Sequence, residues 1–147
     1  SHIDKVGNKG FLENDDLKLS YRHSAYYEND CIITGIYLKL KKGSKEDIKA
    51  KMDDFLQRRK DKQPLEYPSA GSTFKRPEGY YAGALIEECG LKGKSVGGAE
   101  VSTKHAGFVI NKGNATCEDI LHLCRICSET VMKEKGVKLE MEIRVTE

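Results

Sequence analysis

Hydrophobic and polar residues alternate strictly near the C-terminal end of the chain. From Val137 to Val145, five apolar residues occupy every second position and four charged residues fill the places between them. A period of two is typical of a strand with one buried and one exposed face. The pattern therefore predicts a half-buried strand over 137–145.

Two further segments have the composition of strands. Residues 31–40 form a β-branched and aromatic run, which predicts a well-buried strand. Residues 3–6 and 11–12 are short apolar runs separated by a Gly-Asn-Lys-Gly turn, which predicts a β-hairpin. Residues 108–110 form a shorter apolar run that predicts a third strand segment.

The helical period appears in three places. After Ser44, four apolar residues recur with helical spacing: Ile48, Met52, Phe55 and Leu56. This pattern predicts a helix that ends near Pro64. A short helix over 82–89 ends at Gly90, and a longer one runs from about Cys117 to Lys135. Residues 64–79 hold three prolines, so we expect irregular structure there and a boundary between two structural regions.

Composition narrows the function classes. The chain has 147 residues and a net charge of 25 − 23 = +2, too small an excess to indicate a nucleic-acid-binding protein. No apolar run reaches the roughly 18–20 residues that cross a bilayer, and no secretory segment opens the chain, so we expect a cytoplasmic protein without membrane partners. The five cysteines are then expected to be reduced thiols.

Two motifs suggest chemistry that the surrounding residues do not support. Gly93-Lys94-Ser95 resembles the end of a phosphate-binding loop, but Glu88 stands where that loop needs its first glycine. Cys124 and Cys127 invite a zinc or redox interpretation, with Cys117 and His122 nearby. A stripe of core residues on one helix explains the cysteines more simply, and we expect no metal site.

Two other features are open to a functional interpretation. In the segment Ser69–Pro77, small residues surround Ser72, and Lys75 and Arg76 follow it; this suits an anion-binding loop or equally a capped turn with solvated cations. Glu142 and Arg144 share the polar face of the terminal strand, where they could orient an acid substrate, although an exposed salt bridge is the simpler interpretation.

Taken together, these segments resemble one family. Five motifs occur in its order and spacing: YRHS at 21–24, KQP at 62–64, AGSTFKRP at 70–77, GLKG at 90–93 with VGGA at 96–99, and LEMEIR at 139–144. The chain resembles UDP-N-acetylenolpyruvoylglucosamine reductase, a flavoenzyme of bacterial peptidoglycan synthesis. It is similar to the shorter subclass, because no long insertion separates Arg22 from the helix after Ser44.

The resemblance implies an α+β chain that corresponds to the C-terminal part of a family member. Residues 1–42 would be the end of the FAD-binding domain, with most of the FAD site lying upstream, and residues 43–147 the substrate-binding domain with helices packed on a small sheet. The implied reaction reduces UDP-N-acetylglucosamine enolpyruvate to UDP-N-acetylmuramate, with NADPH as the reductant of FAD. The chain alone is expected to be inactive.

The resemblance also implies roles for individual residues. Ser72 matches the proton donor, while Arg22 and Glu142 match residues that polarise the substrate carboxyl group and stabilise the enolate. It implies four substrate-binding residues, which are Tyr21, Lys62, Arg76 and His105. It implies that Arg144 contacts the flavin. Thr73, Arg76 and His105 depart from the best-known pattern, in which an aromatic residue, asparagine and glutamine occur.

The rival hypothesis is a non-catalytic module that binds a UDP-sugar or another anion through its cations. A structural scaffold with a cysteine-rich helix is a third interpretation. The trio Arg22, Ser72 and Glu142 discriminates between them, because a binding module does not require a hydroxyl between an arginine and a carboxylate.

Overall fold

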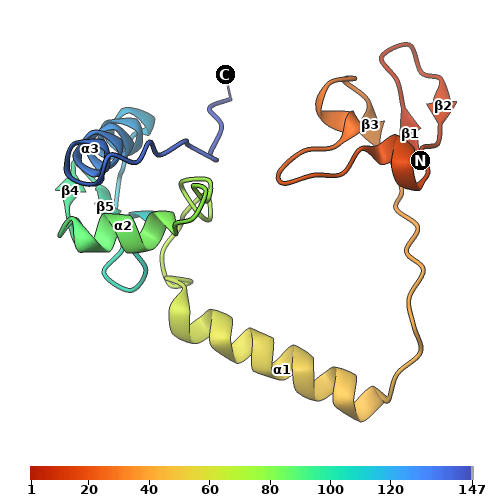
Figure 1. Ribbon diagram of the computed structural model, residues 1–147, viewed down its shortest axis with the longest axis horizontal. Coiled ribbons are helices and arrows are strands. Elements are labelled where there is room, and N and C mark those ends of the chain that lie inside the picture. Colours follow the sequence, from red (N-terminus) through yellow and green to blue (C-terminus); the bar gives the residue numbers. More distant parts are fainter. Residues whose placement is uncertain (147) are drawn as a thin grey trace. The chain divides into compact units, whose positions relative to one another are not determined.

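The computed structural model describes residues 1–146, and the chain divides into two units, Ser1–Ser44 and Lys45–Glu147 (Figure 1). Helices and small antiparallel sheets occur together, so the expected α+β class is confirmed. The assignment of 1–42 and 43–147 to a flavin-binding remnant and a substrate-binding domain stays a prediction.

The first unit is built on a three-stranded antiparallel sheet. Its strands are β1 (His2–Ile3), β2 (Lys9–Gly10) and β3 (Ile32–Ile33), in the order β2-β1-β3. The expected hairpin joins β1 to β2, with Asp4 forming its turn by accepting bonds from the backbone N–H groups of Val6 (2.9 Å) and Asn8 (2.8 Å). Two short 3-10 helices, η1 (Asn14–Leu17) and η2 (Ala25–Tyr27), follow.

The run at 31–40 departs from the prediction of a well-buried strand. Only Ile32–Ile33 pair in the sheet, and Ile36 and Leu38 are 76% and 75% exposed. A β-branched run is stable as a strand when neighbouring strands or helices cover it. Within the unit Ser1–Ser44, no strand or helix covers this run.

The second unit begins with the predicted helix α1 (Lys45–Lys62), which ends before Pro64. Pairs four residues apart stabilise its polar surface, including Arg58 with Asp54 (2.9 Å) and Gln57 with Asp61 (2.8 Å). None of its residues is buried within this unit.

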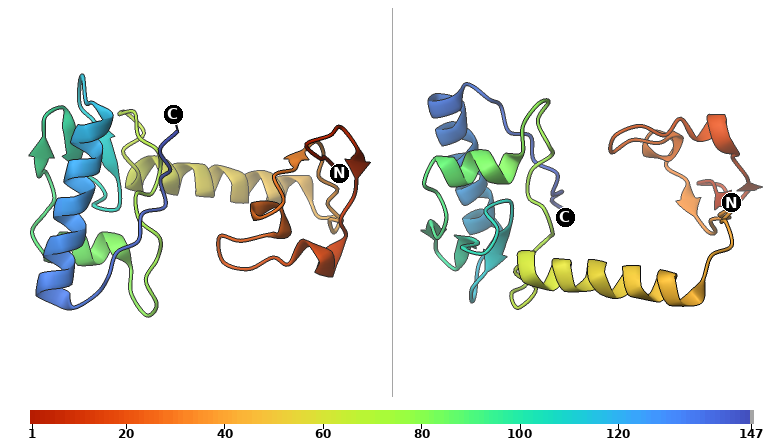
Figure 2. Two further views of the ribbon diagram at one scale, coloured as in Figure 1. Left: turned by 90° about the horizontal axis from the view of Figure 1, so that it is seen from above. Right: turned by 60° about the horizontal axis from the view of Figure 1, so that its bottom comes forward.

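The core lies between a small sheet and two helices. Strands β4 (Ser95–Val96), β5 (Ala99–Val101) and β6 (Val109–Asn111) pair antiparallel in that order. Helix α3 (Cys117–Lys135) packs against all three strands, and α2 (Ala82–Glu88) packs against α3. Figure 1 shows α3 beside the strands, and the right view of Figure 2 shows α2 crossing α3. The residues of this core with 0% exposure come from β5 and α3: Ala99, Val101, Leu123, Cys127 and Val131.

Local signals explain the bounds of α3, which match the prediction. Thr116 caps the helix: its hydroxyl accepts from the Asp119 N–H (3.1 Å), and the Asp119 carboxylate accepts from the Thr116 N–H (2.9 Å). At the other end Gly136 adopts a left-handed conformation and donates its N–H to Met132 (3.0 Å).

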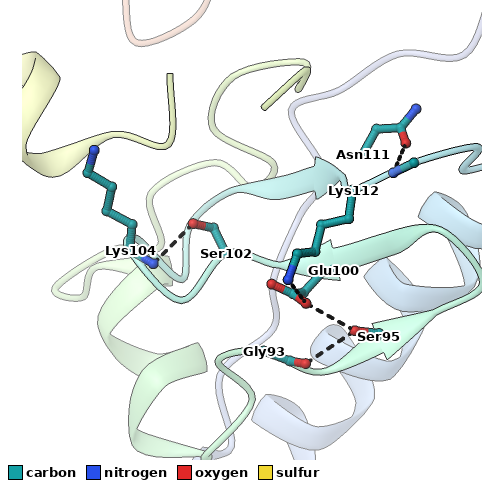
Figure 3. A network of polar contacts seen from close by, with 8 residues as sticks. Gly93, Ser95, Glu100, Ser102, Lys104, Asn111 and Lys112 are labelled. Atoms are coloured by element: carbon teal, nitrogen blue, oxygen red, sulfur yellow. Dashed lines mark hydrogen bonds and ion pairs between the residues drawn. The ribbon is translucent and has the colours of Figure 1, made fainter. Parts of the chain in front are cut away.

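The β4–β5 hairpin was not predicted from the sequence, because it lies in what reads as a glycine-rich connection. Gly98 is required there, since a Cβ atom would stand 2.1 Å from the carbonyl oxygen of Gly113. A polar network spans the three strands (Figure 3): the Glu100 carboxylate accepts from Lys112 (3.0 Å) and from Ser95 (3.4 Å). The hydrogen bond to Glu100 raises the pKa of Lys112.

The terminal segment is extended but is not a continuous strand. It makes a single β-bridge, between Phe74 and Met141. Only some of its alternating apolar residues pack against the core. Leu139 is buried and Val137 and Ile143 pack against the core, whereas Met141 and Val145 are 43% and 61% exposed. The prediction that the whole apolar face is buried is therefore wrong at Met141 and Val145. It is correct at Leu139 and Ile143.

Candidate active site

The loop that carries Ser72 runs through the irregular region between α1 and α2. Gly71 just before it has φ +85°, a conformation that residues with a side chain rarely adopt, and this turn presents Ser72 at the surface. The Ser72 hydroxyl lies 3.4 Å from the carbonyl oxygen of Phe74. The hydroxyl is therefore held only weakly by the protein and is accessible from outside.

Thr73 fixes this loop to two other segments. It is 2% exposed; its N–H donates to the carbonyl of Gly107 (2.8 Å), and its hydroxyl accepts from the N–H of Val109 (2.9 Å). Its carbonyl accepts from the N–H of Glu142 (2.9 Å). From the sequence, Thr73 was noted only as a departure from the family pattern, and its hydrogen bonds to these segments were not predicted. Its hydroxyl group was the one feature of the sequence that could have indicated them.

The terminal segment lies alongside the loop, as two backbone bonds and a bridge show. Glu142 donates to Thr73, and Lys75 donates its N–H to the carbonyl of Glu140 (2.8 Å), on either side of the Phe74–Met141 bridge. The structure thus brings the segments of Ser72 and Glu142 together although they are about 70 residues apart in sequence. That the two side chains face one cleft stays a prediction.

The two cations after Ser72 have different surroundings. Lys75 forms an ion pair with Glu140, and this hydrogen-bonded pair lowers the pKa of the Glu140 carboxyl. The Arg76 guanidinium lies 4.0 Å from the centre of the Tyr81 ring, and its Nε is 3.3 Å from the carbonyl oxygen of Tyr80. Stacking on an aromatic face leaves the edge of a guanidinium able to bind phosphate or carboxylate.

Lys62 and His105 belong to the same unit. Lys62 is the exposed last residue of α1, and the neighbouring Lys60 carbonyl accepts a bond from the Lys104 ammonium (2.7 Å). His105 follows Lys104 directly; its Nδ1 accepts from the Gly107 N–H (3.0 Å), and its ring packs edge-on against Phe108. The hydrogen bond between Lys104 and the Lys60 carbonyl joins the end of α1 to the loop that holds His105.

Arg22 and Tyr21 lie in the first unit, apart in the chain from the Ser72 loop. The Arg22 guanidinium lies 5.4 Å from the Tyr21 ring centre, and Arg22 has a positive φ of +56°. A left-handed arginine is uncommon and marks a backbone held by its surroundings. Arg144 is exposed on the terminal segment. The roles assigned to these three residues stay predictions.

A feature of the first unit that could hold a ligand, a cavity of about 450 Å³, does not fit FAD. Its lining is mostly apolar, with Glu13 as its one charged side chain and no Lys or Arg. A flavin dinucleotide needs donors or cations for its diphosphate. A second cavity, of about 350 Å³, lies beside the Ser72 loop between Thr73, Val109 and Ile143 and has no charged lining residue.

The cysteine cluster on α3 is a feature of the core rather than of the surface. Cys124 and Cys127 are buried, and burial raises their pKa values to about 11 and about 12. Cys117 is exposed and does not belong to the buried stripe that the sequence predicts. Among residues 1–146, no group of three or more His, Cys, Asp or Glu side chains is arranged to hold a metal ion.

The geometry defines a class: an α+β domain whose serine-bearing loop is fixed to the C-terminal segment and to a short sheet. None of the helices in residues 1–146 has the length and apolar character needed to cross a membrane. The sequence pattern described as "UDP-N-acetylenolpyruvoylglucosamine reductase, C-terminal domain" matches residues 63–146.

Individual proteins agree with this match. The UDP-N-acetylenolpyruvoylglucosamine reductases of Caldanaerobacter subterraneus subsp. tengcongensis and Clostridium novyi are each 52% identical over 97% of this chain and 47% of their own length. A crystal structure of the reductase (MurB) from Thermus caldophilus superposes with a TM-score of 0.73 at 38% identity, covering 89% of this chain and 47% of that one.

This chain therefore belongs to the UDP-N-acetylenolpyruvoylglucosamine reductase family, as its motifs predict. It spans about half the length of the curated relatives it matches, and residues 63–146 match the C-terminal domain of the family.

Proposed function

We propose that this chain supplies the substrate-binding and proton-donating part of an oxidoreductase that reduces UDP-N-acetylglucosamine enolpyruvate to UDP-N-acetylmuramate. FAD and NADPH are the redox cofactors proposed for the whole protein, and the FAD site is assigned to a region outside this chain. The reaction belongs to cytoplasmic peptidoglycan synthesis, on which cell wall biogenesis, cell shape and division depend.

The proposed proton transfer centres on Ser72. Addition of a hydride to one carbon of the enolpyruvyl double bond leaves negative charge on the neighbouring carbon, delocalised into the carboxyl group. The Ser72 O–H bond breaks and its proton forms the new C–H bond, with solvent returning a proton to the oxygen. A serine is a weak acid, so it can serve only where this charge develops beside it.

The other residues bind and orient in this scheme. Arg22 and Glu142 hold the substrate carboxyl group and stabilise the enolate. Lys62, Arg76 and His105 lie near the diphosphate and uridine of the bound substrate, and Tyr21 is a further substrate-binding residue. Two cations suit a ligand with two phosphate charges, and the stacking of Arg76 on Tyr81 fits this role.

The observation that supports the proposal most directly is the hydrogen bond between the Glu142 N–H and the Thr73 carbonyl, which holds the terminal glutamate segment beside the serine loop. A non-catalytic module for a UDP-sugar or another anion would account for Arg76 on Tyr81. It would leave the pairing of the serine and glutamate segments without a purpose.

The test is a chimera in which the part of the Caldanaerobacter relative upstream of the matched region is fused to this chain. Ser72→Ala should leave flavin reduction by NADPH unchanged and slow substrate reduction by at least about a hundredfold. Ser69→Ala, in the same loop, is the matched control and should change neither step. Equal losses in both half-reactions would contradict the role of Ser72.

A further inference from the structure

A cation and an aromatic ring lie face to face just after the serine loop, on either side of a tight turn. The guanidinium carbon of Arg76 lies 4.0 Å from the centre of the Tyr81 ring, and the Arg76 Nε donates to the carbonyl oxygen of Tyr80 at 3.3 Å. The ring thus covers one face of the guanidinium while a backbone carbonyl holds its Nε. Contacts of this kind restrict a long side chain that otherwise samples many rotamers.

The sequence of the turn explains why the two side chains meet. The Tyr80 N–H donates to the carbonyl of Pro77 (3.1 Å), and Gly79 has φ +75° at the third position of this turn, where a residue with a side chain is strained. The chain therefore reverses within four residues. The residues that flank the turn, Arg76 and Tyr81, become neighbours as a result.

Both ends of the turn are anchored to the core of the second unit. Before it, Phe74 is buried, and the Lys75 N–H donates to the carbonyl of Glu140 (2.8 Å). After it, Tyr81 directly precedes α2, whose Ile86 is buried. The core thus fixes the backbone of Tyr81 independently of its ring, which is 64% exposed.

We propose that Tyr81 is a positioning residue for Arg76: its ring holds the guanidinium in the orientation that binds two oxygens of the substrate diphosphate. The inference rests on the proposed function, which places Arg76 near the diphosphate. A guanidinium presents paired N–H donors that match two phosphate oxygens, so its orientation decides how well it binds. A side chain that is ordered before the ligand arrives also loses less conformational entropy on binding.

The alternative is a stack that serves only to stabilise the fold. Both side chains are exposed, and neither belongs to the hydrophobic core of the second unit. Exposed cation–π contacts contribute little to folding. An ordered cation four residues after Ser72 is therefore better explained by ligand binding than by stability.

The first measurement tests the stack in the chain alone, without ligand. The ring current of Tyr81 should shift the NMR signals of the Arg76 Cδ protons upfield. Tyr81→Leu should remove this shift, and Tyr81→Phe should keep it because the ring remains. Tyr80→Leu is the matched control: it changes the adjacent exposed ring and leaves the carbonyl that Arg76 contacts. Signals of Arg76 that Tyr81→Leu does not move would overturn the proposal.

The second measurement tests binding in the chimera with the upstream half of the Caldanaerobacter relative. Tyr81→Leu should weaken binding of UDP, and raise the KM for UDP-N-acetylglucosamine enolpyruvate, by about three- to tenfold. It should change kcat by less than about twofold, because the diphosphate is bound equally before and during the reaction. Tyr81→Phe should recover most of the affinity, and Tyr80→Leu should leave it unchanged. A loss of kcat without a rise in KM would contradict a positioning role at the diphosphate.

A double substitution shows whether the ring acts through the guanidinium. Arg76→Ala should weaken UDP binding at least as much as Tyr81→Leu does, and adding Tyr81→Leu to it should have no further effect. Additive losses would overturn the proposal, because the ring would then act without Arg76. A loss in Arg76→Ala with none in Tyr81→Leu would overturn the positioning role alone. Unchanged UDP affinity in Arg76→Ala would instead contradict the proposed function at this residue, and the inference with it.

Discussion

At the scale of single residues, Thr73 connects three segments of the candidate site. One buried side chain and its peptide groups hold the serine loop, the segment of Glu142 and the strand β6 together. The motif around Ser72 could be recognised from the sequence. The structural role of the neighbouring Thr73 could not be predicted, because its hydroxyl bonds to Val109, which is 36 residues away in the sequence.

Thr73→Val should destabilise the chain by about 1–3 kcal/mol, because it leaves the buried N–H of Val109 without an acceptor while preserving side-chain volume. Urea denaturation of the chain measures the change. Thr73→Ser keeps the acceptor and should recover most of the loss. A similar cost for Thr103→Val, at an exposed threonine, would show that the hydrogen bond is not the cause.

The buried thiols predict a dependence of stability on alkaline pH. Burial raises the pKa values of Cys124 and Cys127 to about 11 and about 12, above the ordinary value of 9.0. Their stabilising contribution is complete below pH 9 and is lost as pH rises through 11–12, since the unfolded chain ionises first. Cys124→Ala with Cys127→Ala should flatten the fall in melting temperature between pH 9 and pH 11, measured by calorimetry.

Reactivity provides a check on the same residues. At pH 8, iodoacetamide should modify the exposed Cys117 quickly and the two buried thiols only after denaturant is added, because the thiolate is the reactive form. Rapid labelling of Cys127 in the native chain would be inconsistent with its burial.

At the scale of elements, the sequence predicted the helices whose ends are set by neighbouring residues in the chain. The capping residues of α3 and the glycine after α2 lie in the sequence itself, so both helices could be placed within a residue or two. The hairpin β4–β5 was missed because its close approach to Gly113 depends on tertiary contacts. For 31–40 and α1 the pattern predicted burial, but neither segment is buried within its own unit.

The cap of α3 can be tested directly. Thr116→Ala should lower the free energy of unfolding by about 1 kcal/mol, because the N–H of Asp119 loses its acceptor. Thr116→Ser keeps the oxygen and should retain most of the stability in the same denaturation experiment. No difference between the alanine and serine variants would mean that the capping box contributes nothing measurable.

At the scale of the whole molecule, the second unit has its own core, whereas the first contributes no residue to the buried set. The serine loop, Arg76 and His105 lie in the unit that can fold around this core. Arg22 lies in the other unit. The sequence could identify the site residues by family resemblance, but it could not show whether two units of this chain alone bring them together.

The last prediction is that the purified chain is colourless and does not oxidise NADPH in the presence of UDP-N-acetylglucosamine enolpyruvate. The cavity of the first unit lacks cations for a dinucleotide diphosphate, and catalysis is lost steeply, about a hundredfold for a misplacement of about 1 Å. Ligand binding should survive in part, because the cationic loop belongs to the unit with the core. Titration with the substrate should shift NMR signals near Ser72, Arg76 and His105, and added salt should weaken the effect, since charge dominates an exposed diphosphate contact. Absorbance at flavin wavelengths and NADPH turnover are the decisive measurements. A yellow preparation that turns over substrate would mean that these 147 residues build a complete flavin site.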